Sequence, residues 1–141
     1  MERIESPRTD DNAIEQEIVA KGLTAPRITP ADIEANISSA HYFTARQGVL
    51  GELASDGVPA TAYEQANAAP PALSLLTFCV LVLRNGFTVT GESACASPEN
   101  FDAELGRKIA HANAVTKIWP LMGYELKERL YQRTQPAAAP V

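Results

Sequence analysis

A nearly unbroken apolar run over residues 75–83 dominates the pattern of hydrophobic and polar positions along the chain. Only Thr77 interrupts this run, and its other members are strong strand formers, so we expect a strand that is buried on both faces. Asn85 and Gly86 follow closely and tolerate the positive φ angles of a two-residue turn. Strict alternation of apolar and polar residues then resumes over 87–90. The pattern therefore predicts a β-hairpin.

A helical period marks the part of the chain that follows the hairpin. Apolar residues recur every three or four positions over 101–119, as on one buried stripe of a helix. A serine and a proline just before this stripe can cap and begin the helix, which is predicted over 98–119. Pro120 is expected to end it, because proline inside a helix removes a hydrogen bond. A bend at 123–124 and a last short helix around 126–130 should follow.

Two short helices are expected near the N-terminus. The first, over 10–22, begins at a pair of aspartates, places Ile14 and Ile18 on one face and ends at a glycine. The second begins at Thr29, a capping residue, with proline at the first helical position and Asp32 three residues after the cap. Both helices therefore precede the hairpin in the chain.

The segments between these helices and the hairpin are less regular. Residues 41–44 are aromatic and β-branched, which fits either a short strand or the end of the second helix. Residues 48–71 are rich in Gly, Ala, Pro, Ser and Asp without a clear period, which indicates a long connection. The fold class that we expect is α+β: a β-hairpin or small antiparallel sheet packed against the long helix, with short N-terminal helices.

A chain of 141 residues is expected to form a single domain. Within it we distinguish an N-terminal helical segment (1–47), an Ala/Pro/Gly-rich connection (48–73), a core of hairpin and helices (74–133) and a disordered tail (134–141). A hairpin alone is marginally stable and leaves a sheet face and an edge exposed. We therefore expect a homo-oligomer, either a dimer or a hexamer, that covers these surfaces.

The charge balance restricts the classes of partner. The 17 acidic and 12 basic residues give a net charge of −5 and a pI near 5.0. This balance argues against a dedicated binder of nucleic-acid polymers, whose affinity depends on basic groups, but it permits a small anionic ligand. No apolar stretch approaches the roughly twenty residues that cross a membrane. No secretory leader is visible either, so we expect a cytoplasmic protein without a membrane partner.

No group of side chains suggests catalysis or metal binding. Ser93 and Cys95 have no histidine near them in the sequence. The acidic residues over 92–104 fit helix-end charges better than general acid and base catalysis. Cys79 and Cys95 should remain thiols in a reducing compartment, and the two histidines stand far from them in the chain. We expect no enzyme activity, no metal and no cofactor.

Two stretches of the chain resemble a known family. They are residues 78–102, from the apolar strand through the Asn-Gly turn to Ser-Pro-Glu-Asn, and residues 117–126, with Trp-Pro and Gly-Tyr. Both closely resemble a family of small tailed-phage and prophage proteins, the Gp-forty-nine-like family. Weaker similarity covers 21–30 and 41–45. The resemblance implies a phage or prophage protein in the cytoplasm of a host bacterium.

This family is in turn similar to the Thoeris anti-defence proteins of the first type. Those proteins are sponges that bind cyclic ADP-ribose isomers made by bacterial immune sensors and do not cleave them. They assemble as homo-oligomers, and some also hold cyclic oligonucleotides at separate sites. The resemblance implies that this chain sequesters such a signal, with Phe101 and Leu126 lining the pocket and Lys127 and Arg129 available for phosphate.

The chemistry of such a ligand suggests a wider set of candidates. A purine stacks on an aromatic face, and a pyrophosphate needs two or more cations or a helix N-terminus. The aromatic candidates are Phe101, Tyr124 and Tyr42, and the cationic ones are Arg27, Arg84, Arg107, Lys127 and Arg129. Each also has a plainer interpretation, with Phe101 as a core residue and the cations as solvated surface charges. The alternative function is a non-catalytic structural or regulatory phage protein that binds other proteins.

Overall fold

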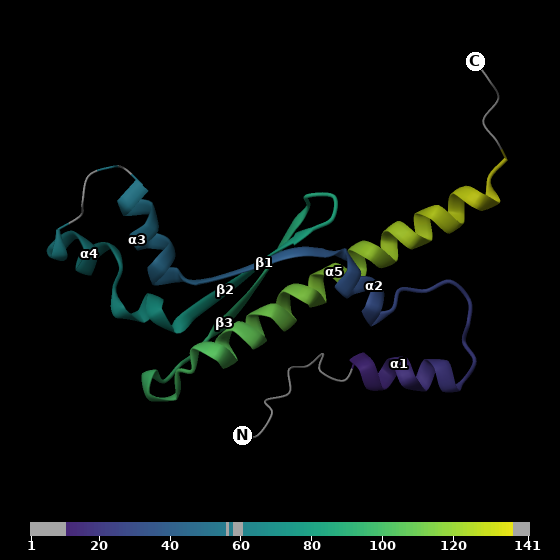
Figure 1. Ribbon diagram of the computed structural model, residues 1–141, viewed down its shortest axis with the longest axis horizontal. Helices are drawn as coiled ribbons and strands as arrows, with labels where there is room; N and C mark the ends of the chain where they lie inside the picture. Colours follow the sequence, from purple (N-terminus) through teal and green to yellow (C-terminus); the bar gives the residue numbers. More distant parts are fainter. Residues whose placement is uncertain (1–10, 56, 58–60, 137–141) are drawn as a thin grey trace, which may run out of the picture.

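The computed structural model describes residues 11–55, 57 and 61–136, so the expectations for 1–10 and for the tail at 137–141 lie outside the described residues. The fold is α+β, as the sequence predicted (Figure 1). In chain order the elements are α1 (Asp11–Ala20), α2 (Pro30–Asn36), β1 (Ile37–Thr44), α3 (Ala45–Ser55), α4 (Ala62–Ala68), the 3-10 helix η1 (Pro71–Leu75), β2 (Leu76–Leu83), β3 (Thr88–Ala94), the 3-10 helix η2 (Pro98–Asn100) and α5 (Ala103–Thr134). Within these described ranges, no helix is long and apolar enough to cross a membrane.

The three strands form one antiparallel sheet in the order β1-β2-β3. Strands β2 and β3 make the predicted hairpin, and Gly86 in its turn has a φ of 89°, which glycine adopts without steric cost. The predicted two-residue turn is wrong, because residues 84–87 connect the strands and Asn85 does not have a positive φ. Strand β1 pairs with the other edge of β2 and places Tyr42 opposite Cys79. Residues 41–44 therefore belong to a strand and not to the end of a helix.

The core lies between the sheet and α5, which runs along one face of the sheet (Figure 1). Leu81 of β2 is completely buried against Ala110 and Ala114 of α5, which are also 0% exposed. The short alanine side chains let the helix approach the strands closely. Gly91 of β3 continues this close contact, because it meets the backbone of α5 where no larger residue fits. The helix and the sheet are thus packed backbone to backbone along this line.

The opposite face of the sheet is not covered in the same way. Along β2, the odd-numbered side chains from Thr77 to Leu83 are buried, whereas the even-numbered ones from Leu76 to Val82 are half-buried. Helices α3 and α4 lie beyond one end of the sheet and not across this second face (Figure 1). The prediction of a strand buried on both faces is therefore wrong for the single chain, although every β2 residue on the second face is apolar.

Helix α5 begins later than predicted. Its N-cap is Asp102, whose Oδ1 accepts a hydrogen bond from the backbone N–H of Leu105 at an N···O distance of 3.1 Å. Ser97 precedes η2 and makes no capping hydrogen bond with its side chain, so its predicted role is wrong. Phe101 consequently lies just before the helix and not in its first turn.

Helix α5 also ends later than predicted. It runs through Pro120, so the expected end, the bend at 123–124 and the separate last helix are all wrong. Met122 packs against the core beyond the proline. Glu125 and Arg129 add an ion pair between adjacent turns, with an N···O distance of 2.7 Å. These interactions offset the stability that the helix loses because proline cannot donate a backbone hydrogen bond.

The connection before the hairpin contains regular structure that the sequence pattern did not reveal. Part of α3, all of α4 and the first residues of η1 lie within 48–73, and Thr61 forms a capping box with Glu64 at the start of α4. These helices are short and bury few side chains, so they leave no clear hydrophobic period. The two N-terminal helices are confirmed, with the predicted capping box between Thr29 and Asp32 at the start of α2.

Candidate functional site

The predicted ligand-binding residues lie in several separate places. Arg107 is on the N-terminal half of α5 and shares a hollow with Tyr42 of β1. Phe101 is half-buried and lines another hollow of about 160 Å³ just before α5. Arg27 lies before α2, where its two terminal nitrogens donate to the carboxylate of Glu15 in α1. These three predicted residues therefore belong to three different parts of the surface.

The other four predicted residues lie on the C-terminal half of α5. Tyr124 and Lys127 are exposed, and 74% of the Tyr124 surface is accessible. With 3.6 residues per turn, both point away from the face of α5 that carries the buried Ile118. Leu126 is half-buried. Arg129, by contrast, lines a groove that it shares with a second arginine and an aromatic ring.

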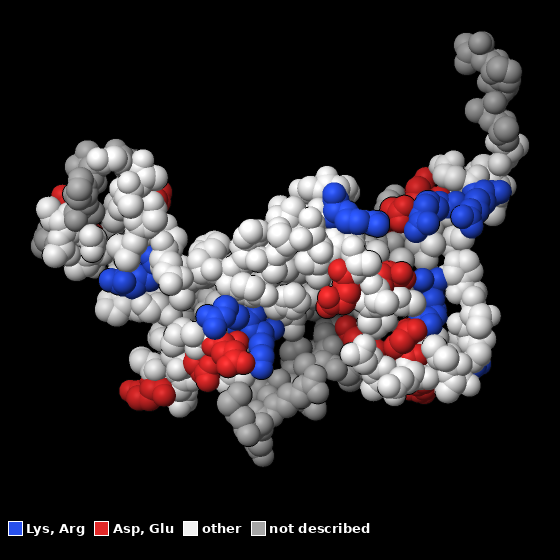
Figure 2. All heavy atoms as spheres, viewed as in Figure 1, with Lys and Arg blue, Asp and Glu red and all other residues white. Residues whose placement is uncertain are grey.

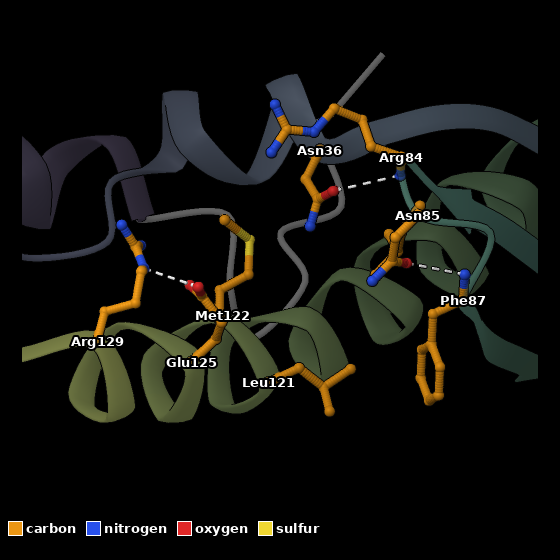
Figure 3. A pocket seen from close by; sticks show the side chains of 9 residues that line it. Asn36, Arg84, Asn85, Phe87, Leu121, Met122, Glu125 and Arg129 are labelled. Carbon is orange, nitrogen blue, oxygen red and sulfur yellow. Dashed lines mark hydrogen bonds and ion pairs between the residues drawn. The ribbon is translucent and has the colours of Figure 1, made fainter. Parts of the chain in front are cut away.

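This groove has a volume of about 580 Å³ and lies between the hairpin turn, the end of α2 and the C-terminal half of α5 (Figure 3). Arg84 and Phe87 come from the turn, and Asn36 comes from α2. Met122 and Arg129 come from α5. Three segments that are far apart in the sequence thus build the groove, and we take it as the candidate functional site.

Hydrogen bonds within the hairpin turn position Phe87 at the groove. The backbone N–H of Leu83 donates to the carbonyl oxygen of Phe87 at 2.8 Å, and the backbone N–H of Phe87 donates to Oδ1 of Asn85 at 3.0 Å. The ring projects from the turn and is 55% exposed. An exposed ring at the mouth of a groove is available for stacking with a planar ligand.

Asn36 connects the turn to the end of α2. The backbone N–H of Arg84 donates to the carbonyl oxygen of Asn36 at 3.0 Å, and it lies 3.3 Å from the side-chain Oδ1 of the same residue. The side-chain nitrogen of Asn36 points toward α5 (Figure 3). This amide can therefore donate a hydrogen bond to a molecule in the groove while its oxygen faces the turn.

Two arginines make the groove positively charged. Arg84 has no ion-pair partner within the described part of the chain. Arg129 donates from Nε to Glu125, which leaves its two terminal nitrogens as further donors. Figure 2 shows Lys and Arg side chains gathered over the C-terminal half of α5, with acidic side chains between them. Two guanidinium groups and one carboxylate leave a net positive charge at the groove.

The side chains that line the groove are of the kinds that suit an anion. Its polar side chains are two amides, two guanidinium groups and one carboxylate, and Leu121 and Met122 supply apolar walls. Guanidinium and amide groups bind anions, but none of these side chains is a nucleophile paired with a base. Across the described residues, no group of three or more His, Cys, Asp or Glu side chains could hold a metal ion.

Sequence reasoning found the two arginines of this groove but missed most of its other residues. Phe87 had a local signal, since it follows the Asn-Gly turn directly and an aromatic residue there is exposed at the tip of a hairpin. Asn36 and Met122 had none, because they face the groove only through the packing of α2 and α5 against the hairpin. The predicted Phe101 and Tyr124 lie outside this groove.

The fold and this groove define a small α+β protein with an open, positively charged depression at one end of its sheet. By sequence, the chain belongs to the Phage protein (N4 Gp49/phage Sf6 gene 66) family, whose model matches residues 28–130. The match begins before α2, ends within the last turns of α5 and includes every residue of the groove. No curated protein and no solved structure matches the chain. The predicted membership of a phage protein family is thus confirmed.

Proposed function

We propose that this phage or prophage protein binds and sequesters a nucleotide immune signal in the cytoplasm of its host bacterium. The ligand class is a cyclic ADP-ribose isomer, with cyclic oligonucleotides as a second possibility, and it is held without being cleaved. One observation carries the proposal: an aromatic residue, Phe87, and two arginines, Arg84 and Arg129, line a single groove of about 580 Å³.

The size and chemistry of the groove suit a ligand of this class. Small-molecule pockets typically have volumes of about 300–1,000 Å³ and combine apolar walls with a few polar groups. A base can stack on Phe87, which contributes about 1–3 kcal/mol in comparable base-aromatic contacts. The two arginines can donate paired hydrogen bonds to phosphate oxygens, and Asn36 adds a neutral donor.

The side chains that line the groove support sequestration without cleavage. Hydrolysis of a glycosidic or phosphate bond needs a positioned nucleophile, a base or a metal ion. The one carboxylate in the groove, Glu125, is engaged by Arg129 at 2.7 Å. We therefore expect the ligand to leave the protein chemically unchanged.

The test is to incubate the protein with a panel of cyclic nucleotides that includes a TIR-produced cyclic ADP-ribose isomer. Free ligand should disappear from the filtrate, and heating the complex should return it unchanged by mass spectrometry. Binding should also raise the melting temperature, because a ligand at a hundredfold excess over Kd adds about 2.7 kcal/mol to the stability of the native state.

Variants at the groove make this test specific. Phe87→Ala and Arg129→Ala should weaken binding, and neither should unfold the protein, because both side chains are exposed. Lys127→Ala is the matched control, since Lys127 is an exposed cation on the other side of the same helix. If Lys127→Ala weakens binding as much as Arg129→Ala does, the ligand does not bind in the groove. A folded wild-type protein that depletes no cyclic nucleotide of the panel would refute the proposal.

We also propose that copies of the chain associate through the uncovered face of the sheet, as a dimer or a hexamer. Phe78, Val80 and Val82 of β2 point to this face and are half-buried. An antiparallel sheet that faces water normally carries polar side chains there. Light scattering after size exclusion should give a multiple of the 15.1 kDa chain mass.

A charge placed on this face tests the association. Val80→Glu should shift the protein toward the monomer, whereas Tyr124→Glu, on the exposed side of α5, should not. The same apolar face also favours the alternative function, a non-catalytic accessory protein that binds other proteins. A wild-type chain that is strictly monomeric would contradict the homo-oligomer and leave the face to another protein.

A further inference from the structure

A second hollow of about 330 Å³ lies beside the edge strand β1, at the N-terminal half of α5. Tyr42 lines it from β1, and Glu104, Arg107, Lys108 and His111 line it from α5. Leu121, the first residue of α5 that lines the groove, comes ten positions after His111. At a rise of 1.5 Å per residue, the two lie about 15 Å apart along the helix axis. This hollow is therefore distinct from the groove at the hairpin turn.

Tyr42 and His111 form a fixed pair at the base of this hollow. The hydroxyl of Tyr42 and Nδ1 of His111 are 2.9 Å apart, and the two rings lie at 24° with their centroids 6.4 Å apart. Tyr42 stands opposite Cys79 in the sheet, and its partial burial raises the pKa of its hydroxyl. The phenol thus keeps its proton at neutral pH and remains a hydrogen-bond donor.

The cations at the rim of the hollow are not equivalent. Lys108 forms an ion pair with Glu104 one turn earlier, with an N···O distance of 3.3 Å. The guanidinium group of Arg107 has no hydrogen bond and no ion pair with any other residue of the described ranges. Its positive charge is close enough to Tyr42 to act on the hydroxyl electrostatically. The hollow therefore combines an unpaired guanidinium with a paired lysine, an imidazole and a phenol.

We infer that this hollow is a binding site for the phosphate group of a small phosphorylated molecule. Arg107 donates to two phosphate oxygens through its planar guanidinium, and Lys108 adds a second positive charge. The free nitrogen of His111 supplies a further contact, while the ring of Tyr42 forms an apolar floor beside the ligand. This site does not depend on the groove at the hairpin turn.

The test uses the two histidines of the chain as reporters. His111 lines the hollow, whereas His41 lies on the opposite face of the sheet, where its Nε2 is 3.0 Å from the hydroxyl of Ser39. Titration of the labelled full chain with inorganic phosphate, and separately with adenosine monophosphate, should move the ring signals of His111 in NMR spectra. The signals of His41 should stay in place, and sodium chloride of equal ionic strength should move neither.

Variants then assign the site to the unpaired arginine. Arg107→Ala should weaken phosphate binding by roughly tenfold or more, as expected when a charge-assisted hydrogen-bond pair is lost. Arg133→Ala, at an exposed arginine in the last turn of α5, should leave the affinity unchanged. Far-UV circular dichroism checks that each variant is folded. Equal shifts of both histidines, no shift at millimolar phosphate, or unchanged affinity in folded Arg107→Ala would each overturn the inference.

Discussion

The contact between Gly91 and helix α5 gives the sharpest test of how the sheet and the helix pack. Gly91 is buried in β3 and faces the backbone of α5. A Cβ atom at this position would lie 2.1 Å from the carbonyl oxygen of Ala110 and 2.3 Å from the amide nitrogen of Ala114. Both atoms belong to the helix backbone, so no change of side-chain rotamer can relieve the overlap. Gly91→Ala must therefore push the strand and the helix apart.

The magnitude follows from the distances. Carbon atoms in good contact are about 3.5–4.0 Å apart, so the overlap requires a separation of more than about 1 Å. Overpacking a core typically costs about 1–3 kcal/mol. A gap of this size also loosens the packing around Leu81 and Ile118, which are completely buried in the core between the sheet and α5. We expect Gly91→Ala to lower the free energy of unfolding by about 3 kcal/mol, a large part of the roughly 5–15 kcal/mol of a typical domain.

Urea unfolding followed by circular dichroism measures this loss through linear extrapolation. Gly123→Ala is the matched control, because Gly123 lies inside α5 and a Cβ there meets nothing within 4 Å. Alanine is a better helix former than glycine, so the control should gain about 0.5–1 kcal/mol. A Gly91→Ala protein within about 0.5 kcal/mol of the wild type would show that β3 and α5 do not make this contact.

Three further predictions concern the ends and the middle of the helices. Thr29→Ala removes the cap of α2, so it should lower the free energy of unfolding by about 1 kcal/mol in the same assay. The backbone N–H and the hydroxyl of Thr29 hold the pKa of Asp32 below its usual value. The stabilisation from this carboxylate is thus present above its unfolded pKa and disappears as the pH falls through the folded one. We therefore expect the free energy of unfolding, measured in urea at several pH values, to fall less steeply below about pH 4 in Asp32→Asn than in the wild type. Pro120→Ala should raise the melting temperature, because proline inside a helix costs up to about 3 kcal/mol relative to alanine; an unchanged or lower value would contradict the continuous helix.

The hairpin and the start of α2 could be predicted from the sequence because their signals are local. The Asn-Gly pair at 85–86 indicates a turn through its backbone preferences, and Gly86 has the expected positive φ, although Asn85 does not. The capping box of Thr29 and Asp32 likewise depends on residues three positions apart. Such elements need little information from the rest of the chain.

The course of α5 could not be predicted because its local and tertiary signals disagree. Pro120 and Gly123 both suggest the end of a helix. The packing of Met122 against the core and the ion pair between Glu125 and Arg129 favour its continuation. The structure shows that these interactions prevail, and none of them can be recognised before the position of the sheet is known.

The candidate site shows the same limit more strongly. The sequence identified Arg84 and Arg129 as cations, but it could not place them at one groove, since 45 positions separate them in the numbering. The predicted aromatic residues Phe101 and Tyr124 lie elsewhere, and the ring at the groove is that of Phe87. Convergence of side chains depends on the packing of α2 and α5 against the hairpin, which no local pattern contains.

The error about β2 is itself informative about assembly. The strand was predicted to be buried on both faces because all of its residues except Thr77 are apolar. The chain covers one face with α5 and leaves Phe78, Val80 and Val82 half-buried on the other. Full burial of an apolar side chain contributes about 1.5–3 kcal/mol relative to full exposure, and each half-buried side chain forgoes part of this free energy. A second copy that covers this face would recover part of that free energy, so the composition of β2 favours the homo-oligomer, and Val80→Glu tests that association at the centre of the face.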